Sequence, residues 1–384
     1  MKHFLLFLSL SVSLCLQSQD FSNSPWHIEA NNIDPNNYYG ITVANGMVGM
    51  VSSAEPLKVS EVILNGVYDY YQRGRVSNIL KTFSHMNMHL EVDGSRIDRK
   101  NISNYKQTLD MKKAKLITTF DIGDKITIQH QNMSLRNLPF SAMSIIEIKA
   151  HKDVEITPIN YISAPDHLSD VRNLYSEIDR PHVLIPLMTS VALSPGKKKV
   201  ATSTSFIFPE KHGYEPNIIH EDWDYNMHLM KFKIKLKAGE TYRFALVGST
   251  MSSVHNNDPQ NEVERLTIFA KLEGIERLES AHEKAWGNLW KSDIEINGDL
   301  TSQRAVRSAM YHLYSFARKG TAYSLSPMGL SGLGYNGHVF WDTELWMFPP
   351  LLVLQPEIAK SLLEYRFVRL EAAKQNAFAH GYDG

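Results

Sequence analysis

The stretch from Gly334 to Pro350 reads GYNGHVFWDTELWMFPP and combines closely spaced aromatic rings with two carboxylates in an apolar run. Asp342 and Glu344 lie two residues apart between these rings. A ring beside a carboxylate suits a sugar, because C–H faces stack on the ring while the carboxylate accepts hydrogen bonds from hydroxyl groups. The same pattern also fits a buried junction between a loop and a helix, where Asp342 only caps the helix. Residue types alone leave both interpretations open.

The run from His338 to Glu344, followed by Met347–Pro350, closely resembles glycoside hydrolase family 65. That family includes the maltose, trehalose and kojibiose phosphorylases, acid trehalases, and the glucosidase acting on glucosyl-galactosyl-hydroxylysine. The resemblance is dense from Met328 to Gly384 and looser before it. It continues through Leu351–Leu352, Pro356–Glu357, Leu363–Arg366 and Ala379–Tyr382.

The resemblance implies a chain that is β first and α afterwards. The family has an N-terminal super-β-sandwich, linker helices and a catalytic (α/α)6 barrel. We therefore expect a signal peptide over 1–18, a β-sandwich over 19–258, a helical linker over 259–298 and the N-terminal part of the barrel over 299–384. The residues after Leu300 supply only about three helices at ordinary helix and loop lengths. We expect the barrel to be incomplete and this chain to be the front part of a longer protein.

The residue pattern before Thr250 independently indicates strands. The clearest strand is predicted over Lys231–Lys237, where lysines alternate with apolar residues so that one face is buried. Leu116–Gln129 predicts a hairpin. Many short strands without a long helical pattern indicate a large antiparallel sandwich. Turns are predicted at Asn45–Gly46, Asn65–Gly66, Asp93–Gly94, Gly123–Asp124 and Ala238–Gly239.

The hydrophobic period changes to a helical one after Pro259. Residues 260–272 predict a helix with Val263, Leu266 and Phe269 on one side. A second helix is predicted to offer Trp286 and Trp290 to a neighbouring domain. A third is predicted to begin near Thr301, and its apolar stripe comprises Val306, Ala309, Met310, Leu313, Phe316 and Ala317.

Prolines and a glycine predict where the last helices begin and end. Pro349–Pro350 cannot continue a helix interior, so a helix from Thr343 must be short or kinked there. Pro356 fits a first helical position, and Gly381 fits the position just past a helix end.

The resemblance also implies the chemistry. Family members invert the anomeric centre: a carboxylic acid protonates the glycosidic oxygen while a nucleophile attacks from the opposite face. That nucleophile is water activated by a second carboxylate in hydrolases and inorganic phosphate in phosphorylases. The resemblance places the general acid and base beyond Gly384, so we assign no catalytic residue here and expect this chain alone to be inactive.

Trp341 and Asp342 match the family residues that hold the non-reducing glucosyl unit in the −1 subsite. We expect Asp342 to accept hydrogen bonds from the outer hydroxyls and Trp341 to pack against the sugar ring. Phe340, Tyr335 and His338 are expected to shape the same wall, with ordinary packing as their favoured alternative. Glu344 is expected to be a structural residue at the helix start.

The N-terminus favours hydrolysis over phosphorolysis. Lys2 and His3 precede an apolar run to Leu16 and then the polar Gln17–Asp20, which predicts a signal peptide and a periplasmic or secreted protein. Phosphorolysis yields a sugar phosphate that is useful only where a cytoplasm retains it. The expected function is therefore hydrolysis of α-linked glucosyl disaccharides or glucosyl ends, with kojibiose-like α-1,2 linkages first and trehalose next. An inverting disaccharide phosphorylase and a non-catalytic sugar-binding protein on the same scaffold stay open.

Composition limits the other partners. A formal net charge of -1 gives no basic footprint for nucleic acid. The apolar run is too short to span a bilayer, so we expect no membrane attachment after cleavage. Cys15 is the only cysteine, which leaves no disulfide or thiol nucleophile in the mature chain. Among 16 histidines only His85 and His89 form a close pair, and we expect neither a metal nor a cofactor. A homodimer through the sandwich is a further expectation.

Overall fold

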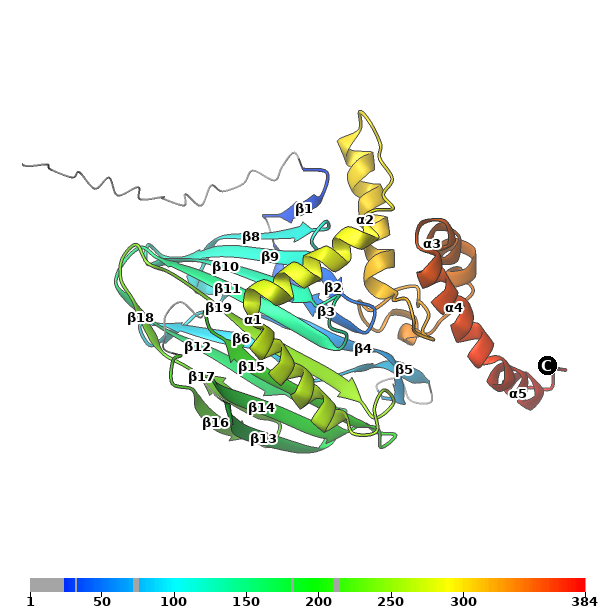
Figure 1. The fold of residues 1–384 in the computed structure, drawn as a ribbon, viewed down its shortest axis with the longest axis horizontal. Coiled ribbons are helices and arrows are strands. Elements are labelled where there is room, and N and C mark those ends of the chain that lie inside the picture. Colours follow the sequence, from blue (N-terminus) through cyan, green and yellow to red (C-terminus); the bar gives the residue numbers. More distant parts are fainter. Residues whose placement is uncertain (1–23, 32, 72–75, 181–182, 210–214, 384) are drawn as a thin grey trace, which may run out of the picture.

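The computed structural model describes residues 24–31, 33–71, 76–180, 183–209 and 215–383. The expected signal peptide and Cys15 lie outside the described residues. Within these residues every strand lies between His27 and Ser252, and every α-helix begins at Pro259 or later (Figure 1). The expected order of β then α is confirmed, while the exact domain boundaries stay predictions.

The largest sheet is antiparallel and forms one layer of the sandwich. The predicted hairpin over Leu116–Gln129 is confirmed, since Phe120 and Ile128 are paired and both are buried. In spatial order this nine-stranded sheet comprises β1 (His27–Ala30), β8 (Ser103–Asp110), β9 (Lys115–Ile122), β10 (Ile126–Ser134), β11 (Ser141–Ala150), β19 (Thr241–Ser252), β15 (Lys199–Ile207), β14 (Val183–Leu193) and β13 (Ser169–Arg180).

Two smaller sheets complete the β region. One contains β16 (Ile219–Asp224), β17 (Met227–Lys231), β12 (Val154–Ser163), β6 (Ser84–Val92) and β7 (Ser95–Arg96), with β18 (Ile234–Leu236) also paired to β12. The other contains β2 (Thr42–Ala44), β3 (Val48–Ser52), β4 (Val59–Tyr70) and β5 (Ser77–Lys81).

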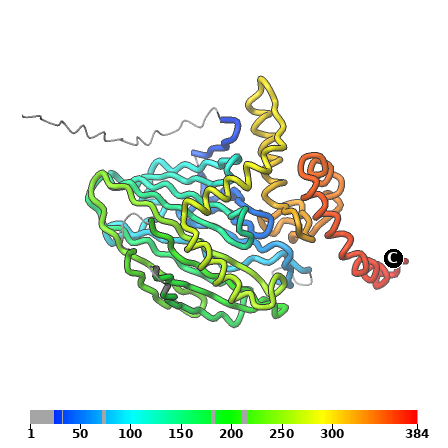
Figure 2. The backbone as a smooth tube through the Cα atoms, in the orientation of Figure 1, coloured from blue at the N-terminus to red at the C-terminus, as the bar shows by residue number. Residues whose placement is uncertain are grey.

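Figure 2 shows the backbone of the sheet layers. Aromatic rings fill the space between these layers. Phe206 on β15 and Phe244 on β19 reach across from the large sheet to Phe232. The Phe232 ring lies 5.0 Å from Phe206 and 5.2 Å from Phe244, both edge to face. All three rings are fully buried, so the sandwich core is centred on them.

The strand predicted over Lys231–Lys237 is interrupted. β17 ends at Lys231 and β18 starts at Ile234, although both pair with β12 in one continuous register. The interruption lies opposite Pro158, which accepts a hydrogen bond from Phe232 but has no N–H to donate. The alternation therefore predicted the buried face correctly but missed the break in the ladder.

The turn predicted at Asn65–Gly66 is wrong. These residues lie inside β4, where the pairing with β5 shifts register between Leu64 and Tyr68. Gly66 has φ 76°, and a Cβ at this position would come 2.2 Å from the Tyr323 ring. A bulge and the close approach of the loop that contains Tyr323, after α2, explain this glycine.

Helix α1 (Pro259–Leu289) crosses the outer face of the nine-stranded sheet (Figure 1). Its backbone leaves the helical conformation at Gly274, which divides it into two segments. Val263 and Leu266 are buried as predicted, but Phe269 is exposed. A spacing of three residues drifts around a helix of 3.6 residues per turn, and the buried Ala270 takes the inner position instead.

Trp286 of α1 and Trp290, the residue that caps its C-terminal end, join the sandwich to helix α2 (Leu300–Phe316), as predicted. Trp286 stacks on Tyr311 with ring centroids 5.4 Å apart. Trp290 contacts Tyr314 edge to face at 5.4 Å. The predicted α2 stripe is rotated, since Ala309 is exposed. Buried α2 side chains include Gln303, Arg307, Met310, Tyr311 and Tyr314.

Helices α3 (Phe348–Leu354), α4 (Pro356–Val368) and α5 (Leu370–Ala379) follow. The prolines stand in the first turns of α3 and α4, as predicted. Gly381 has φ 81° just past α5, also as predicted. These helices expose a series of apolar side chains: Leu352, Val353, Leu363, Phe367, Val368 and Phe378.

No helix in the described ranges is long and apolar enough to cross a membrane.

Candidate functional site

The Gly334–Pro350 stretch begins with a tight turn. Tyr335, Asn336 and Gly337 all have positive φ angles, of 52°, 57° and 69°. A Cβ at Gly337 would come 2.4 Å from Cγ2 of Ile79 on β5. Only glycine therefore allows this backbone to lie against the sandwich.

Two residues of the sandwich hold this turn in place. The Tyr68 hydroxyl on β4 donates a hydrogen bond to the Gly337 carbonyl at 2.8 Å. Burial raises the pKa of Tyr68, which keeps the hydroxyl protonated as a donor. The His338 Nε2–H donates to the Ser77 carbonyl at 2.7 Å, and the His338 ring packs on Tyr68. His338 is thus bound to the sandwich, consistent with the packing alternative for this residue.

The far end of the segment is fixed from two other directions. Beyond the turn the chain forms a π-helical segment, η6 (Thr343–Met347), before α3. The buried Thr343 hydroxyl donates to the Leu325 carbonyl at 2.6 Å. Glu344 accepts two hydrogen bonds from Arg366 on α4, each 2.8 Å long. This bidentate pair gives Glu344 the structural role expected of it.

Asp342 lies between these anchors, but its side chain takes part in neither of them. It precedes η6 with helical angles (φ −54°, ψ −34°), and its side chain makes no capping hydrogen bond. The interpretation of Asp342 as a helix cap is therefore wrong. Its half-buried carboxylate makes no hydrogen bond or ion pair to any described residue. A carboxylate in this state can accept hydrogen bonds from a ligand.

Exposed aromatic residues precede Asp342 in this segment. Trp341 is 62% exposed, and Phe340 and Tyr335 are exposed as well. The Tyr335 and Phe340 rings meet edge to face, 5.8 Å apart. The structure thus brings Tyr335 and Phe340 together, leaves Trp341 exposed, and turns His338 towards the sandwich. An apolar ring and a carboxylate at one surface can bind a sugar, with the ring on its C–H face.

The sequence did not identify the residues that support the segment. Tyr68 and Ser77 belong to strands far away along the chain, and no local pattern links them to Gly337. Arg366 lies inside the stretch that resembles the family, but nothing local pairs it with Glu344.

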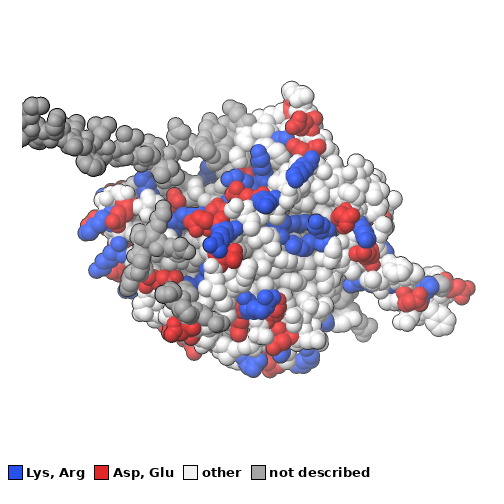
Figure 3. All heavy atoms as spheres, in the orientation of Figure 1, with Lys and Arg blue, Asp and Glu red and all other residues white. Residues whose placement is uncertain are grey.

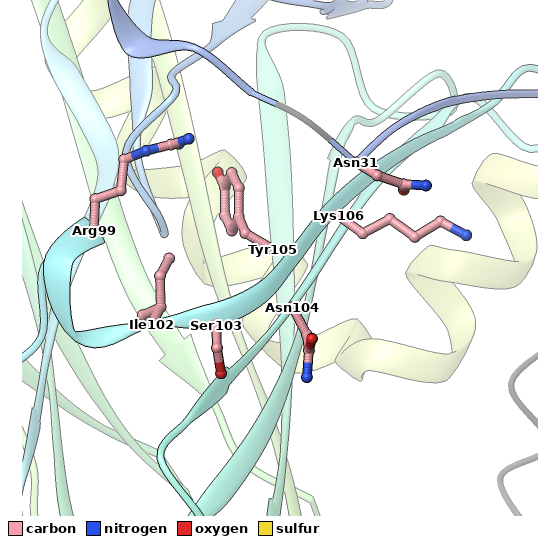
Figure 4. Close-up of a pocket in the computed structure, with 7 residues that line it drawn as sticks. All are labelled: Asn31, Arg99, Ile102, Ser103, Asn104, Tyr105 and Lys106. Carbon is pink, nitrogen blue, oxygen red and sulfur yellow. The ribbon is translucent and has the colours of Figure 1, made fainter.

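The hollow in Figure 4 has a volume of about 550 Å³ but lies elsewhere, on the β8 side of the sandwich. Its lining contains no carboxylate that could protonate a glycosidic oxygen. Arg99 there is bound to the carbonyls of Ile33 and Ala54, and Lys106 pairs with Glu29. This hollow is not a glycosidase centre.

The charges and the histidines of the sandwich bear on nucleic-acid and metal binding. On the face shown in Figure 3, acidic and basic side chains are interspersed, unlike a nucleic-acid footprint. His85 is buried and its Nδ1 donates to the Phe83 carbonyl, while Nη2 of Arg96 lies 2.6 Å from Nε2 of His89. A guanidinium at this distance excludes a metal cation from the His85–His89 pair.

Comparisons with known proteins agree on one family. The family description "Glycosyl hydrolase family 65, N-terminal domain" matches residues 40–289, and "Glycosyl hydrolase family 65 central catalytic domain" matches residues 307–384. A kojibiose hydrolase of Mucilaginibacter mallensis is 54% identical over 94% of this chain and 54% of its own length. A kojibiose hydrolase of Flavobacterium johnsoniae is 51% identical over 100% of this chain and 56% of its own length.

The fold has a counterpart among solved structures. A protein from the human microbiome, provisionally assigned as a kojibiose phosphorylase, superposes with a TM-score of 0.74 at 16% identity. The match covers 92% of this chain and 50% of that chain, and at this identity it shows a shared fold. This chain spans about half the length of the curated relatives it matches.

Proposed function

This chain belongs to glycoside hydrolase family 65, and from that premise we propose that it carries the sugar-holding wall of a secreted, inverting α-glucoside hydrolase. The substrate is a glucosyl disaccharide or glucosyl end, with kojibiose-like α-1,2 linkages first and trehalose next. The identities of 54% and 51% to kojibiose hydrolases support this choice over a phosphorylase. The observation that carries the proposal is that the Asp342 carboxylate makes no hydrogen bond to a described residue and follows directly on the exposed Trp341.

In this proposal Asp342 accepts hydrogen bonds from the outer hydroxyls of the glucosyl unit, and Trp341 packs on its C–H face. The general acid and the base that activates water come from residues after Gly384. An inverting hydrolase separates these two carboxyl groups by roughly 6.5–9.5 Å, which leaves room for the water. Hydrogen bonds to Asp342 that tighten as the ring flattens would lower the barrier rather than only improve binding.

The surrounding contacts support a preorganised site. The segment is fixed before Asp342 by Tyr68 and after it by Thr343 and Arg366. An anchored backbone on both sides lowers the cost of placing the carboxylate when sugar binds. The Asp342 carboxylate makes no hydrogen bond to any described residue, which supports a role in ligand binding.

The test is the substitution Asp342→Asn in the full-length protein, with kojibiose as substrate. The change keeps the shape, removes the charge and turns one acceptor into a donor. Loss of a charge-assisted hydrogen bond worth about 1.5–3 kcal/mol should lower kcat/KM by roughly one to two orders of magnitude. The melting temperature should stay unchanged. Asp124→Asn, at an exposed hairpin tip on the sandwich, is the matched control and should keep full activity.

The products separate the alternatives. A hydrolase releases glucose whether or not phosphate is present, and inversion gives β-glucose first. Glucose phosphate formed only with inorganic phosphate would instead identify a phosphorylase, and binding without turnover would identify a sugar-binding protein. A lowered melting temperature with normal kinetics in Asp342→Asn would place the sugar site elsewhere. Secretion, and a dimer formed through the sandwich, remain predictions from the sequence.

A further inference from the structure

Three metal-ligand side chains gather at one edge of the six-stranded sheet, away from the Asp342 segment. His220 and Asp222 are two residues apart on β16, so the strand period places both on one face. His228 on β17 is the register partner of Asp222, which puts it on the same face and diagonal to His220. The strand register therefore builds a His-Asp-His cluster from two neighbouring strands.

The distances in this cluster fit a tetrahedral metal ion. His220 Nε2 lies 3.2 Å from His228 Nδ1 and 3.8 Å from Asp222 Oδ1. One ligand atom from each residue lies within 4.8 Å of the other two. Zinc–nitrogen bonds of 2.0–2.1 Å in a tetrahedron separate two ligand atoms by about 3.3 Å. The two imidazole nitrogens already have about this separation.

A hydrogen-bonded chain from the facing sheet sets the tautomer of His228. The Ser190 hydroxyl on β14 donates to Oδ1 of Asn173 at 2.8 Å. Its oxygen therefore accepts from Nε2–H of His228, 2.9 Å away. This leaves the lone pair on Nδ1 of His228 pointing at His220. Metal-binding histidines are commonly oriented in this way by a partner on their other nitrogen.

The cluster is sheltered on one side and open on the other. His228 is fully buried, at 0% exposure. The Tyr175 ring stacks on His220 at 4.4 Å and fixes the plane of that imidazole. The Asp222 side chain is 74% exposed, which gives an ion a path from solvent and room for a water as the fourth ligand.

We propose that His220, Asp222 and His228 bind a divalent transition metal ion of borderline softness, with Zn²⁺ as the reference ion. Two imidazoles and one carboxylate suit this class better than Mg²⁺ or Ca²⁺, which prefer all-oxygen sites. On binding, the proton on Nε2 of His220 moves to its Nδ1, and the ion replaces the hydrogen bond between the histidines. The ion would tie the edge strands β16 and β17 together and, through Ser190, to the large sheet. This inference is independent of the proposed hydrolase activity.

The test uses tag-free, chelator-stripped protein titrated with ZnCl2 by calorimetry, and with Co²⁺ by visible absorption. One equivalent of each should bind, and Co²⁺ should give the intense visible bands of a tetrahedral site. His220→Gln should weaken Zn²⁺ binding at least tenfold. Ser190→Ala removes no ligand but should weaken it by about 10- to 100-fold. His151→Gln, at an exposed histidine outside the cluster, should leave the titration unchanged.

Asp222→Asn protects the test against misfolding, because this exposed side chain contributes little packing. It should keep the circular dichroism spectrum and still weaken Zn²⁺ binding. The proposal is overturned if the unsubstituted protein binds no equivalent of Zn²⁺. It is equally overturned if His220→Gln and Asp222→Asn both bind Zn²⁺ like the unsubstituted protein, or if His151→Gln weakens binding as much as they do.

Discussion

Trp286 and Trp290 offer a matched test of buried hydrogen bonding at the junction between sandwich and helices. Trp286 lies in the last turn of α1 and Trp290 is its C-terminal cap residue, and they pack on Tyr311 and Tyr314 of α2, respectively. Their indole N–H groups differ. Trp290 Nε1 donates to the Met111 carbonyl at 3.0 Å, whereas Trp286 Nε1 is buried with no partner among the described residues.

Replacing each tryptophan with phenylalanine should therefore have unequal effects on the free energy of unfolding. Trp290→Phe loses a net hydrogen bond worth about 0.5–1.5 kcal/mol. Trp286→Phe relieves an unpaired buried donor that costs about 1–3 kcal/mol. It also weakens the contact with the Arg136 guanidinium, 5.9 Å from the ring, by up to about 1 kcal/mol. Because both variants lose similar ring area, Trp286→Phe should be the more stable by about 2 kcal/mol.

Urea unfolding followed by far-ultraviolet circular dichroism measures this difference. The two variants have identical composition, so differences in tryptophan content cannot distort the comparison. Their slopes with denaturant should match, since the same surface is exposed on unfolding. An unfolding midpoint for Trp286→Phe equal to or below that of Trp290→Phe would refute the assignment of the unpaired indole.

Two further substitutions test the turn and the buried histidines. Gly337→Ala should destabilise the fold by more than the roughly 1–2 kcal/mol cost of a left-handed alanine, because its Cβ would also meet Ile79. Gly94→Ala, with φ 76° but no atom within 4 Å of its Cβ, should show the conformational cost alone, and equal losses in urea unfolding would contradict the close contact at Gly337. Burial lowers the pKa of His282 to about 4, below its unfolded value near 6.5, so its contribution to stability is present above pH 6.5 and is lost as the pH falls towards 4. His282→Gln should flatten the stability profile in that window, by up to about 1.4 kcal/mol per pH unit, and parallel profiles would rule out this histidine as a source of acid sensitivity.

The sequence predicted the fold where the deciding information is local. Alternation within Lys231–Lys237 shows which face is buried, because side-chain direction follows from the strand period alone. The break between β17 and β18 depends on Pro158 in another strand, and the bulge at Gly66 depends on Tyr323 in a later loop. Such features follow from pairing and packing between distant residues, which periodicity cannot report.

In the candidate site, too, the sequence predicted what neighbouring residues determine and missed what distant residues determine. The adjacency of Trp341 and Asp342 in a run of rings was enough to single them out. The orientation of Asp342 as an uncommitted carboxylate was not predictable, since a cap and a ligand-binding residue use the same amino acid at the same helix position. The structure distinguishes the two roles. Asp342 has helical backbone angles, and its side chain makes no capping hydrogen bond. The role of His338 was also not predictable from neighbouring residues. Its hydrogen-bond partner, the Ser77 carbonyl, belongs to the sandwich.

The hydrogen bond from Tyr68 to Gly337 has a consequence for protein engineering. Chimeras of multidomain enzymes are usually joined within the linker, on the assumption that each domain contains all the residues that hold its functional segments in place. Here a crossover in α1 would pair the Gly334–Pro350 segment of one parent with β4 and β5 of another. Recombination should therefore exchange β4, β5 and the segment around Gly337 as one block, even though more than 250 positions of chain separate them.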